Sequence, residues 1–203
     1  STLLDLLNPE FKLSSRGRRR LPRPPIPKLE PWEMVQLARR PDRPRSRDYI
    51  NRIFVHFVEL RGDRIQGDDD SVITGIGRLA GITCFICGQQ KQFPETDVPS
   101  DSTHDRVDAN ASEIKPEGFR KAQRIINLAE RFKLPLITFI DTPGFKQKPT
   151  WEHHGLGSAI ASTISALASV RVPVISALIG EGGSEAALAF GVSDRVLMLQ
   201  NAI

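Results

Sequence analysis

The second half of the chain alternates helical and strand patterns with short connections between them. The segment "PEGFRKAQRIINLAERFK" (116–133) gathers its apolar residues on one helical face and has a proline near its start, which predicts a helix. The runs "LPLITFID", "VPVISALI" and "DRVLMLQ" are continuously apolar, and "GSAIASTISALASV" and "SEAALAFGV" between them predict two more helices. Continuously apolar strands are typical of buried parallel sheets. The pattern therefore predicts an α/β fold in which helices cover parallel strands.

Upstream of residue 116 the patterns are of three other kinds. An apolar stripe in "SRDYINRIFVHFVEL" (46–60) indicates a helix, with Ser46 or Asp48 as its cap. The segment "SVITGIGRLAGITCFICGQQ" (71–90) predicts a two-stranded hairpin that turns at Gly81. Residues 92–113 contain six acidic residues and almost no apolar pattern, so we expect a mobile acidic loop there.

Positive charge is confined to the start of the chain. The net charge is +4, but residues 1–48 carry twelve Lys or Arg and six Asp or Glu, and the remainder is net −2. This segment is rich in Pro and Arg and has little apolar periodicity, which predicts an extended arm over residues 1–47 and a folded domain over residues 48–203. Because the arm lacks interleaved aromatic residues, we expect it to be solvated or to dock on a partner rather than to bind nucleic acid.

The two ends and the apolar content suggest where the protein works. No apolar stretch reaches the ~20 residues of a membrane span and no secretory signal precedes the arm, so we expect no membrane association and a cytoplasmic or organelle-stroma location. The chain ends with "RVLMLQNAI", within a predicted strand, so the C-terminal part of the domain is expected to be truncated.

Two pairs of potential ligands have unsuitable spacing for a metal site. Cys84 and Cys87 form a CxxC motif, but a spacing of three along a strand directs their side chains to opposite faces. We interpret them as core residues. The adjacent His153 and His154 also point apart, and we expect them in a surface loop.

Two nucleotide-binding motifs are incomplete. The string "DTPG" (141–144) follows an apolar strand, as in GTPases, but the chain has no P-loop. The turn that begins at Gly180 lacks the third glycine of a dinucleotide fingerprint, because residue 185 is Glu. What remains for "IGEGGSEAALAFGV" (179–192) is a helix start whose unpaired backbone amides can stabilise negative charge on an oxygen, as enolate and acyl chemistry requires.

Several stretches in fixed order resemble the α subunits of acetyl-CoA carboxylase carboxyltransferase, a family with the crotonase-like (ClpP/crotonase) fold. They are "WEMVQLARRPDRPRSRDYINRIFVHFVELRGDR", "ITGIGRLAG", "GFRKAQRIINLAERFKLPLITFIDTPG", "GSAIA", "VPVISALIGEGGS" and "ALAFGVSDRVLMLQNAI". The resemblance covers nearly everything from Trp32 to the last residue except residues 92–113 and 145–154.

The resemblance implies a transfer reaction and several partners. The family moves a carboxyl group from carboxybiotin, carried on a biotin carboxyl carrier protein, to acetyl-CoA, and so makes malonyl-CoA for fatty acid synthesis. It implies a hetero-oligomer with a β-type subunit that carries a zinc ribbon and with another copy of this chain, and it implies no metal in this chain. The backbone of Gly182, Gly183 and Ser184 would form the oxyanion or biotin side. Lys91, Pro143 and Gly144 would contact the substrate.

Departures from the family motif leave two hypotheses about catalysis open. Two family glycines after Ser184 are replaced by Glu185 and Ala186, and "FKQKPTWEHH" replaces a turn of small residues. The acidic loop replaces a basic segment, which disfavours attraction of a polyanionic CoA. The hypotheses are an active α-type subunit and a degenerate, non-catalytic α-like paralogue with a structural or regulatory role. A free-standing crotonase-type hydratase is weaker, because no acid and base carboxylate pair is evident at helix ends.

Overall fold

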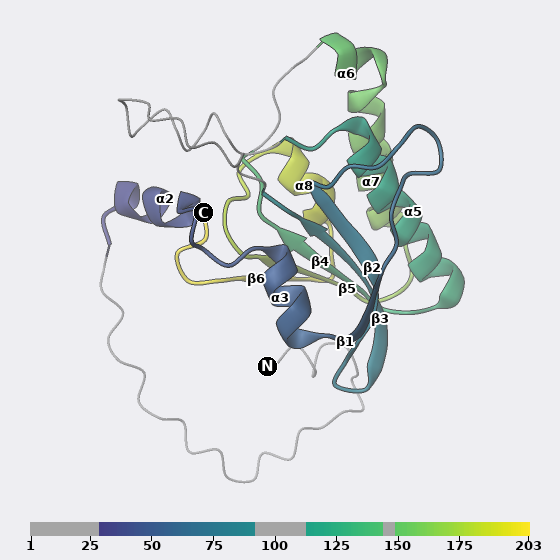
Figure 1. The fold of residues 1–203 in the computed structure, drawn as a ribbon, viewed down its shortest axis with the longest axis horizontal. Coiled ribbons are helices and arrows are strands. Elements are labelled where there is room, and N and C mark those ends of the chain that lie inside the picture. The colour runs from purple at the N-terminus through teal and green to yellow at the C-terminus, as the bar shows by residue number, and fades with distance from the viewer. Residues whose placement is uncertain (1–28, 92–112, 144–148) are drawn as a thin grey trace.

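The computed structural model describes residues 29–91, 113–143 and 149–203, which form one mixed sheet with helices on both faces (Figure 1). The expected acidic loop at 92–113 falls almost entirely outside the described residues, as do residues 1–28 of the expected arm. The helices are α2 (Pro31–Arg39), α3 (Ser46–Ile53), α5 (Pro116–Phe132), α6 (Pro149–His153), α7 (Leu156–Ser169) and α8 (Glu185–Gly191). The strands are β1 (Val55–Glu59), β2 (Val72–Leu79), β3 (Ile82–Gln89), β4 (Leu136–Ile140), β5 (Val174–Leu178) and β6 (Arg195–Met198).

The sheet follows the order of the chain, from β1 at one edge to β6 at the other. Strands β1, β2 and β3 pair antiparallel, whereas β3, β4, β5 and β6 pair parallel. The hairpin expected at 71–90 is confirmed, and its turn at Ala80 and Gly81 uses left-handed backbone, with φ of 48° and 88°. The expected parallel, helix-connected strands are confirmed for β3 to β6.

Two apolar cores lie on opposite faces of the sheet. The larger one packs α5, α7 and α8 against the sheet and includes Phe119, Leu136 and Phe190, and the smaller one packs α3 on the other face. Cys87 belongs to the larger core and Cys84 to the smaller one, so the prediction that they face apart is confirmed. Burial raises the pKa of the Cys84 thiol to about 12 and raises that of Cys87 as well.

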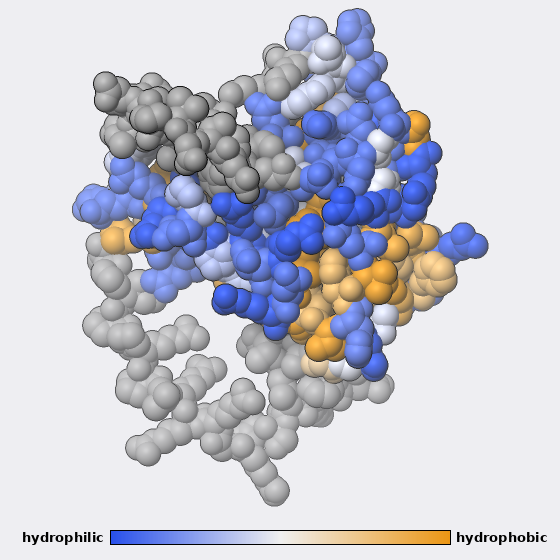
Figure 2. Space-filling view, viewed as in Figure 1, coloured by the Kyte–Doolittle hydropathy of each residue, from blue (hydrophilic) through white to orange (hydrophobic). Residues whose placement is uncertain are grey.

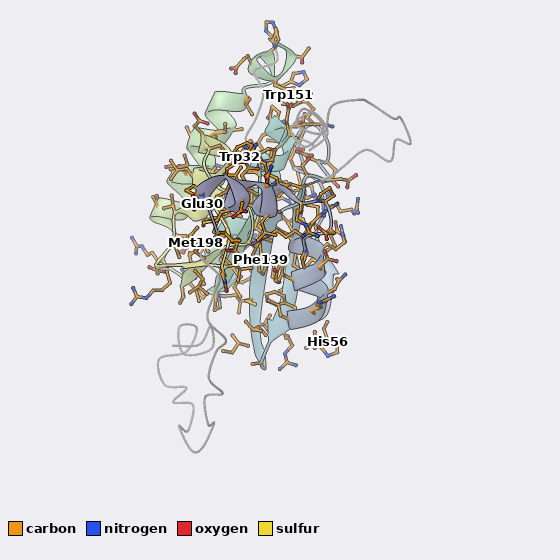
Figure 3. All side chains as sticks on the ribbon, turned by 90° about the vertical axis from the view of Figure 1, so that its left-hand side faces the viewer. Glu30, Trp32, His56, Phe139, Trp151 and Met198 are labelled. Carbon is orange, nitrogen blue, oxygen red and sulfur yellow. The ribbon has the colours of Figure 1, made fainter. Side chains whose placement is uncertain are left out.

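The prediction of one helix over residues 46–60 is wrong in its second half. The helix ends at Ile53, and Val55–Glu59 forms the edge strand β1, which pairs with β2. The β-branched and aromatic residues of "VHFV" favour a strand. Their apolar positions also fit the helical spacing of the residues before them, and for this reason the sequence pattern extended the predicted helix too far. A bulge between Val55 and Val58 puts His56 at a φ of 54°. Figure 3 shows His56 far from Trp32, which lies on α2.

The prediction of an extended arm is wrong for residues 31–39, which form the helix α2. The helix begins with a capping box, in which the Glu30 side chain accepts from the Glu33 N–H and the Glu33 side chain accepts from the Glu30 N–H. The segment after α2 contacts the domain through arginines, since Arg43 Nε donates to the carbonyl of Ile179 at 2.9 Å. The arginines that suggested a solvated or partner-docking arm therefore include side chains that dock on this chain itself.

Apolar side chains remain exposed at both edges of the sheet. All four residues of β6 are exposed, which departs from the expectation that helices cover the strands, and Val196 and Met198 have 60% and 58% of their surface open. At the other edge Val55 and Val58 are similarly open, and Phe132 at the end of α5 is 59% exposed. Figure 2 shows an apolar area where Figure 1 draws the lower part of the hairpin and the end of α5. No helix in the described ranges is long and apolar enough to cross a membrane.

Candidate functional site

The candidate site lies where three neighbouring parallel strands end. Lys91 comes two residues after β3, Asp141 directly follows β4, and Glu181 comes three residues after β5. Because β3, β4 and β5 are adjacent and parallel, their carboxyl ends meet at one edge of the sheet. Ligands of open α/β sheets bind at this edge, outside the carboxyl ends of the strands.

A buried ionic cluster joins these three ends. Lys91 Nζ lies 3.0 Å from Asp141 Oδ1 and 3.1 Å from Glu181 Oε2, and the three side chains are 5 to 10% exposed. Buried charges require full pairing, because removing one partner strands an uncompensated charge in a medium of low dielectric constant. The cluster is therefore a rigid unit that fixes the three strand ends relative to one another.

Helix α2 adds a second cation to the cluster. Arg39 Nε and one terminal nitrogen both donate to Glu181 Oε1, at 3.0 and 2.8 Å. Glu181 thus pairs with Arg39 through one oxygen and with Lys91 through the other. The ion pair connects α2 to the glycine-rich turn (residues 180–184), although Arg39 and Glu181 lie 142 residues apart in the sequence.

The same cluster holds the glycine-rich turn through backbone hydrogen bonds. Asp141 Oδ1 accepts from the Glu181 N–H at 3.0 Å, and the Thr142 N–H donates to the Glu181 carbonyl at 2.9 Å. A Cβ at Gly180 would overlap the Asp141 carboxylate, so this position requires glycine. The Gly182 N–H donates to the carbonyl of Ile203 at 2.8 Å and is therefore engaged within the chain.

Helix α8 begins immediately after the turn. Ser184 is its N-cap, and its Oγ accepts from the Ala187 N–H at 3.3 Å. The N–H groups of Glu185 and Ala186 occupy the first helical positions, which have no partner within a helix. Because Ala186 is fully buried, only the amide of Glu185 remains a candidate donor at the start of α8.

The two residues that replace the family glycines behave differently. The Glu185 side chain is exposed, whereas Ala186 is fully buried and packs in the larger core. The Ala186 carbonyl accepts from Gln89 Nε2 at 2.6 Å, and Gln89 Oε1 accepts from the Asp141 N–H at 3.2 Å. Of these two residues only Glu185 adds a charge at the turn, since the Ala186 methyl is part of the core.

A cavity of about 250 Å³ lies beside the turn. Gly182, Gly183 and Ser184 form one wall, and side chains from β4, β5, β6 and α8 form the rest, including those of Ile140, Leu178 and Leu188. Within 4 Å of a Cβ placed on Gly183 there is no atom, so this backbone is accessible. The site thus combines an open glycine backbone with apolar walls.

The predicted site residues separate into two groups. Gly182, Gly183 and Ser184 meet at the cavity, and Pro143, half-buried, follows two residues after Asp141. Gly144 lies outside the described residues. The Lys91 ammonium contacts buried carboxylates, so a substrate phosphate could reach it only by displacing one of them. The substrate-binding roles of Lys91, Pro143 and Gly144 stay predictions.

Sequence reasoning missed the residues that position the turn. Asp141, Glu181, Gln89 and Arg39 were not selected, although Asp141 directly follows an apolar run and Glu181 lies only a few residues after another. Polar residues at the carboxyl ends of predicted parallel strands were the available signal. Among the residues that the structure describes, no group of three or more His, Cys, Asp or Glu side chains could hold a metal ion.

Comparison with known proteins decides the family. The family model described as "Acetyl co-enzyme A carboxylase carboxyltransferase-like" matches residues 11–203. The chain belongs to this family. Curated relatives carry the name "Acetyl-coenzyme A carboxylase carboxyl transferase subunit alpha". The protein from Thioalkalivibrio sulfidiphilus is 46% identical over 85% of this chain, and that from Paraburkholderia phymatum is 42% identical over 96%. These matches cover 52% and 58% of the two relatives, so the carboxyltransferase-like chain spans little more than half of their length.

Solved structures confirm the crotonase-like fold of this carboxyltransferase-like chain. The β subunit of geranyl-CoA carboxylase from P. aeruginosa superposes with a TM-score of 0.59 at 23% identity, covering 77% of this chain and 27% of that one. A transcarboxylase 12S core structure gives a TM-score of 0.61 at 21% identity, covering 78% and 29%. At these identities the likeness establishes the fold alone.

Proposed function

We propose that this chain is an α-type subunit of acetyl-CoA carboxylase carboxyltransferase, which helps to transfer a carboxyl group from carboxybiotin to acetyl-CoA. The supporting observation is the 42 to 47% identity to named α subunits over 85 to 96% of the chain. The fold, the glycine backbone at the cavity and the ionic cluster beneath it agree with this assignment.

The chemistry needs backbone donors that stabilise negative charge on an oxygen in the transition state. In this chain the candidate donors are the backbone N–H groups of Gly183 and Ser184, residues that line the cavity, and of Glu185 at the start of α8. Lys91, Asp141 and Glu181 hold the turn that carries them. Biotin would arrive on the carrier protein and supply the carboxyl group, and the apolar walls and the open Gly183 backbone fit its uncharged ring system. We place acetyl-CoA as the substrate, held with a β-type subunit.

Glu185 separates the active subunit from the alternative of a degenerate paralogue. Its carboxylate is exposed in the first turn of α8 and competes with any oxyanion for the same amides. Loss of one oxyanion donor in other enzymes costs about 2.7–4 kcal/mol. If Glu185 blocks the site, E185G should raise malonyl-CoA formation by at least about tenfold, which corresponds to ~1.4 kcal/mol.

The matched control for E185G is A186G. Because Ala186 is fully buried in the core, A186G should leave the transfer rate unchanged and lower helix stability by about 1 kcal/mol. Both variants are assayed in the complete complex with carboxybiotin and acetyl-CoA. A fast native complex that E185G does not accelerate would refute the blocking role. Inactivity of all forms, with the β-type subunit still bound, would favour a structural or regulatory subunit.

The proposed partners are a β-type subunit with a zinc ribbon, the biotin carboxyl carrier protein and a second copy of this chain. The proposed compartment is the cytoplasm or an organelle stroma. The exposed apolar strand β6 and the open side chain of Leu188 agree with an assembled state. Purification from the native source should recover the chain with a β-type subunit, and isolation as a lone monomer would count against the assignment.

The free-standing hydratase remains the weakest hypothesis. Such an enzyme needs an acid and a base carboxylate that are available to the substrate. Of the three carboxylates at this site, Asp141 and Glu181 are both buried and both paired with Lys91, which leaves Glu185 without a second available carboxylate beside it.

A further inference from the structure

Arginine side chains gather in a groove on α5 that is separate from the glycine-rich turn. The groove has a volume of about 360 Å³ and lies between α5 and the loop that joins β1 to β2. Four arginines line it: Arg64, Arg120, Arg124 and Arg131. No residue of this arginine groove lines the cavity beside the turn. Figure 2 shows hydrophilic residues gathered over this side of the molecule.

The Asp63 carboxylate, which lines the arginine groove, already has hydrogen-bond partners on both of its oxygens. Asp63 has a buried side chain that accepts from Arg120 Nε at 2.8 Å. Its other oxygen accepts from the backbone N–H groups of residues 65, 66 and 67 at 2.8 to 2.9 Å. Burial opposes ionisation of Asp63, but these backbone amides and Arg120 outweigh it and hold its pKa well below the ordinary value. Within the described ranges Asp63 therefore forms its ion pair with Arg120 and with none of the other three arginines.

Among the described residues the other three arginines form no ion pair with a carboxylate, and only the charge of Arg124 is partly offset, at a distance, by Asp68 and Asp63. Arg124 donates to the carbonyls of residues 60, 61 and 62 at 3.0 to 3.1 Å, and these acceptors are neutral. Within the described ranges Arg64 and Arg131 make no ion pair and no side-chain hydrogen bond. The nearby carboxylate of Asp68 forms its ion pairs with Lys121 and Arg61, and it acts on Arg124 only through its charge at a distance. Three like charges thus share one groove, an arrangement that an anion would stabilise.

We propose that the arginine groove binds a phosphate-bearing small molecule of the nucleotide class. Guanidinium groups match phosphate oxygens with paired hydrogen bonds, and the volume is within the ~300–1,000 Å³ of small-molecule sites. Ile65, whose side chain is 78% exposed, and Leu128 offer apolar surface to a base. The side-chain amides of Gln123 and Asn127 offer hydrogen bonds to a base edge or a ribose. This site is additional to carboxyl transfer and does not depend on it.

Calorimetry of the full chain at physiological salt, with ADP and inorganic pyrophosphate as probes, tests the proposal. ADP should bind saturably with one site per chain, and R64E/R131E should weaken binding by at least tenfold. The milder R64Q/R131Q, which adds no negative charge, should give a smaller loss. R195E changes an exposed arginine on β6 and should leave the affinity unchanged. Circular dichroism should show the same fold for all variants, because the replaced side chains are exposed. Pyrophosphate binding with the same dependence on Arg64 and Arg131 would assign recognition to the phosphates.

Three results would overturn the proposal. The first is no saturable ADP binding, or equal weakening by R195E. The second is pyrophosphate binding that disappears at physiological salt, which would indicate an adventitious ion only. The third is binding of a polyglutamate peptide or single-stranded RNA through Arg64 and Arg131 that ADP does not displace, which would assign the groove to a macromolecule.

Discussion

Replacing Lys91 with methionine should destabilise the fold strongly. Methionine keeps most of the side-chain length and removes the charge that lies 3.0 Å from Asp141 and 3.1 Å from Glu181. Glu181 keeps its pairing with Arg39, so Asp141 is the carboxylate left without an ion-pair partner. Breaking a buried pair by removing one partner costs about 3–5 kcal/mol. We expect K91M to lower the free energy of unfolding by an amount in that range.

The measurement is urea unfolding at pH 7 followed by circular dichroism, with K133M as the matched control. Lys133 pairs with Glu130 at 2.7 Å, but its side chain is 71% exposed. Exposed pairs are worth about 0–1 kcal/mol, so K133M should lose no more than that. The double variant K91M/D141N removes the uncompensated charge and should be more stable than K91M, with a coupling energy of about 0.5–3 kcal/mol.

Two outcomes would refute this reasoning about the cluster. K91M could lose no more stability than K133M, which would show that the buried contacts are not energetically coupled to folding. Alternatively, D141N could add its full loss on top of K91M. Additive losses would mean that the two residues act independently and do not hold the turn as one unit.

Two further predictions concern the turn and the loop before β2. G180A should lower the free energy of unfolding by about 1–3 kcal/mol, because the new Cβ overlaps the Asp141 carboxylate. G183A, whose Cβ meets no neighbouring atom, should change it by no more than about 0.5 kcal/mol. Thermal melting distinguishes the two variants, and equal losses would contradict the steric argument. D63N should cost about 1.5–3 kcal/mol at pH 7. Because the pKa of Asp63 is lowered in the folded state, its charge stabilises the fold fully above the unfolded pKa of about 3.9, and this contribution is lost progressively as the pH falls from that value toward the much lower folded pKa. Urea titrations from pH 7 to pH 3 should therefore show the difference between wild type and D63N begin to narrow below about pH 4, and a constant difference would contradict the linkage.

The parallel part of the fold was predictable because it depends on local patterns. Three continuously apolar runs separated by amphipathic helices allow few arrangements, and Gly81 marks a hairpin turn. Strand β1 was mistaken for a helix because its pairing with β2 and the contact of Phe57 with the smaller core depend on the tertiary fold, which a single segment does not reveal. Helix α2 was missed because it has only nine residues and the Pro- and Arg-rich sequence on both sides of it dominates the composition of this segment.

The candidate site was only half predictable. The turn at Gly182, Gly183 and Ser184 stands out in the sequence, and the cavity beside it lies where the turn was expected to act. The ionic cluster that holds the turn was not predicted, because Arg39 and Glu181 are far apart in sequence and their pairing depends on the tertiary fold. Lys91 was selected for its charge, but the structure shows that this charge is directed into the protein.

The Arg39–Glu181 contact also determines when the turn can take its final shape. The contacts of residues 39 and 43 with residues 181 and 179 close loops of 142 and 136 residues. Contacts of such sequence separation form slowly, because the entropy of closing the loop precedes the gain from the contact. The hairpin of β2 and β3 needs only neighbouring residues and can form early. During synthesis the glycine-rich turn must therefore emerge before Arg39 and Arg43 can make their final contacts.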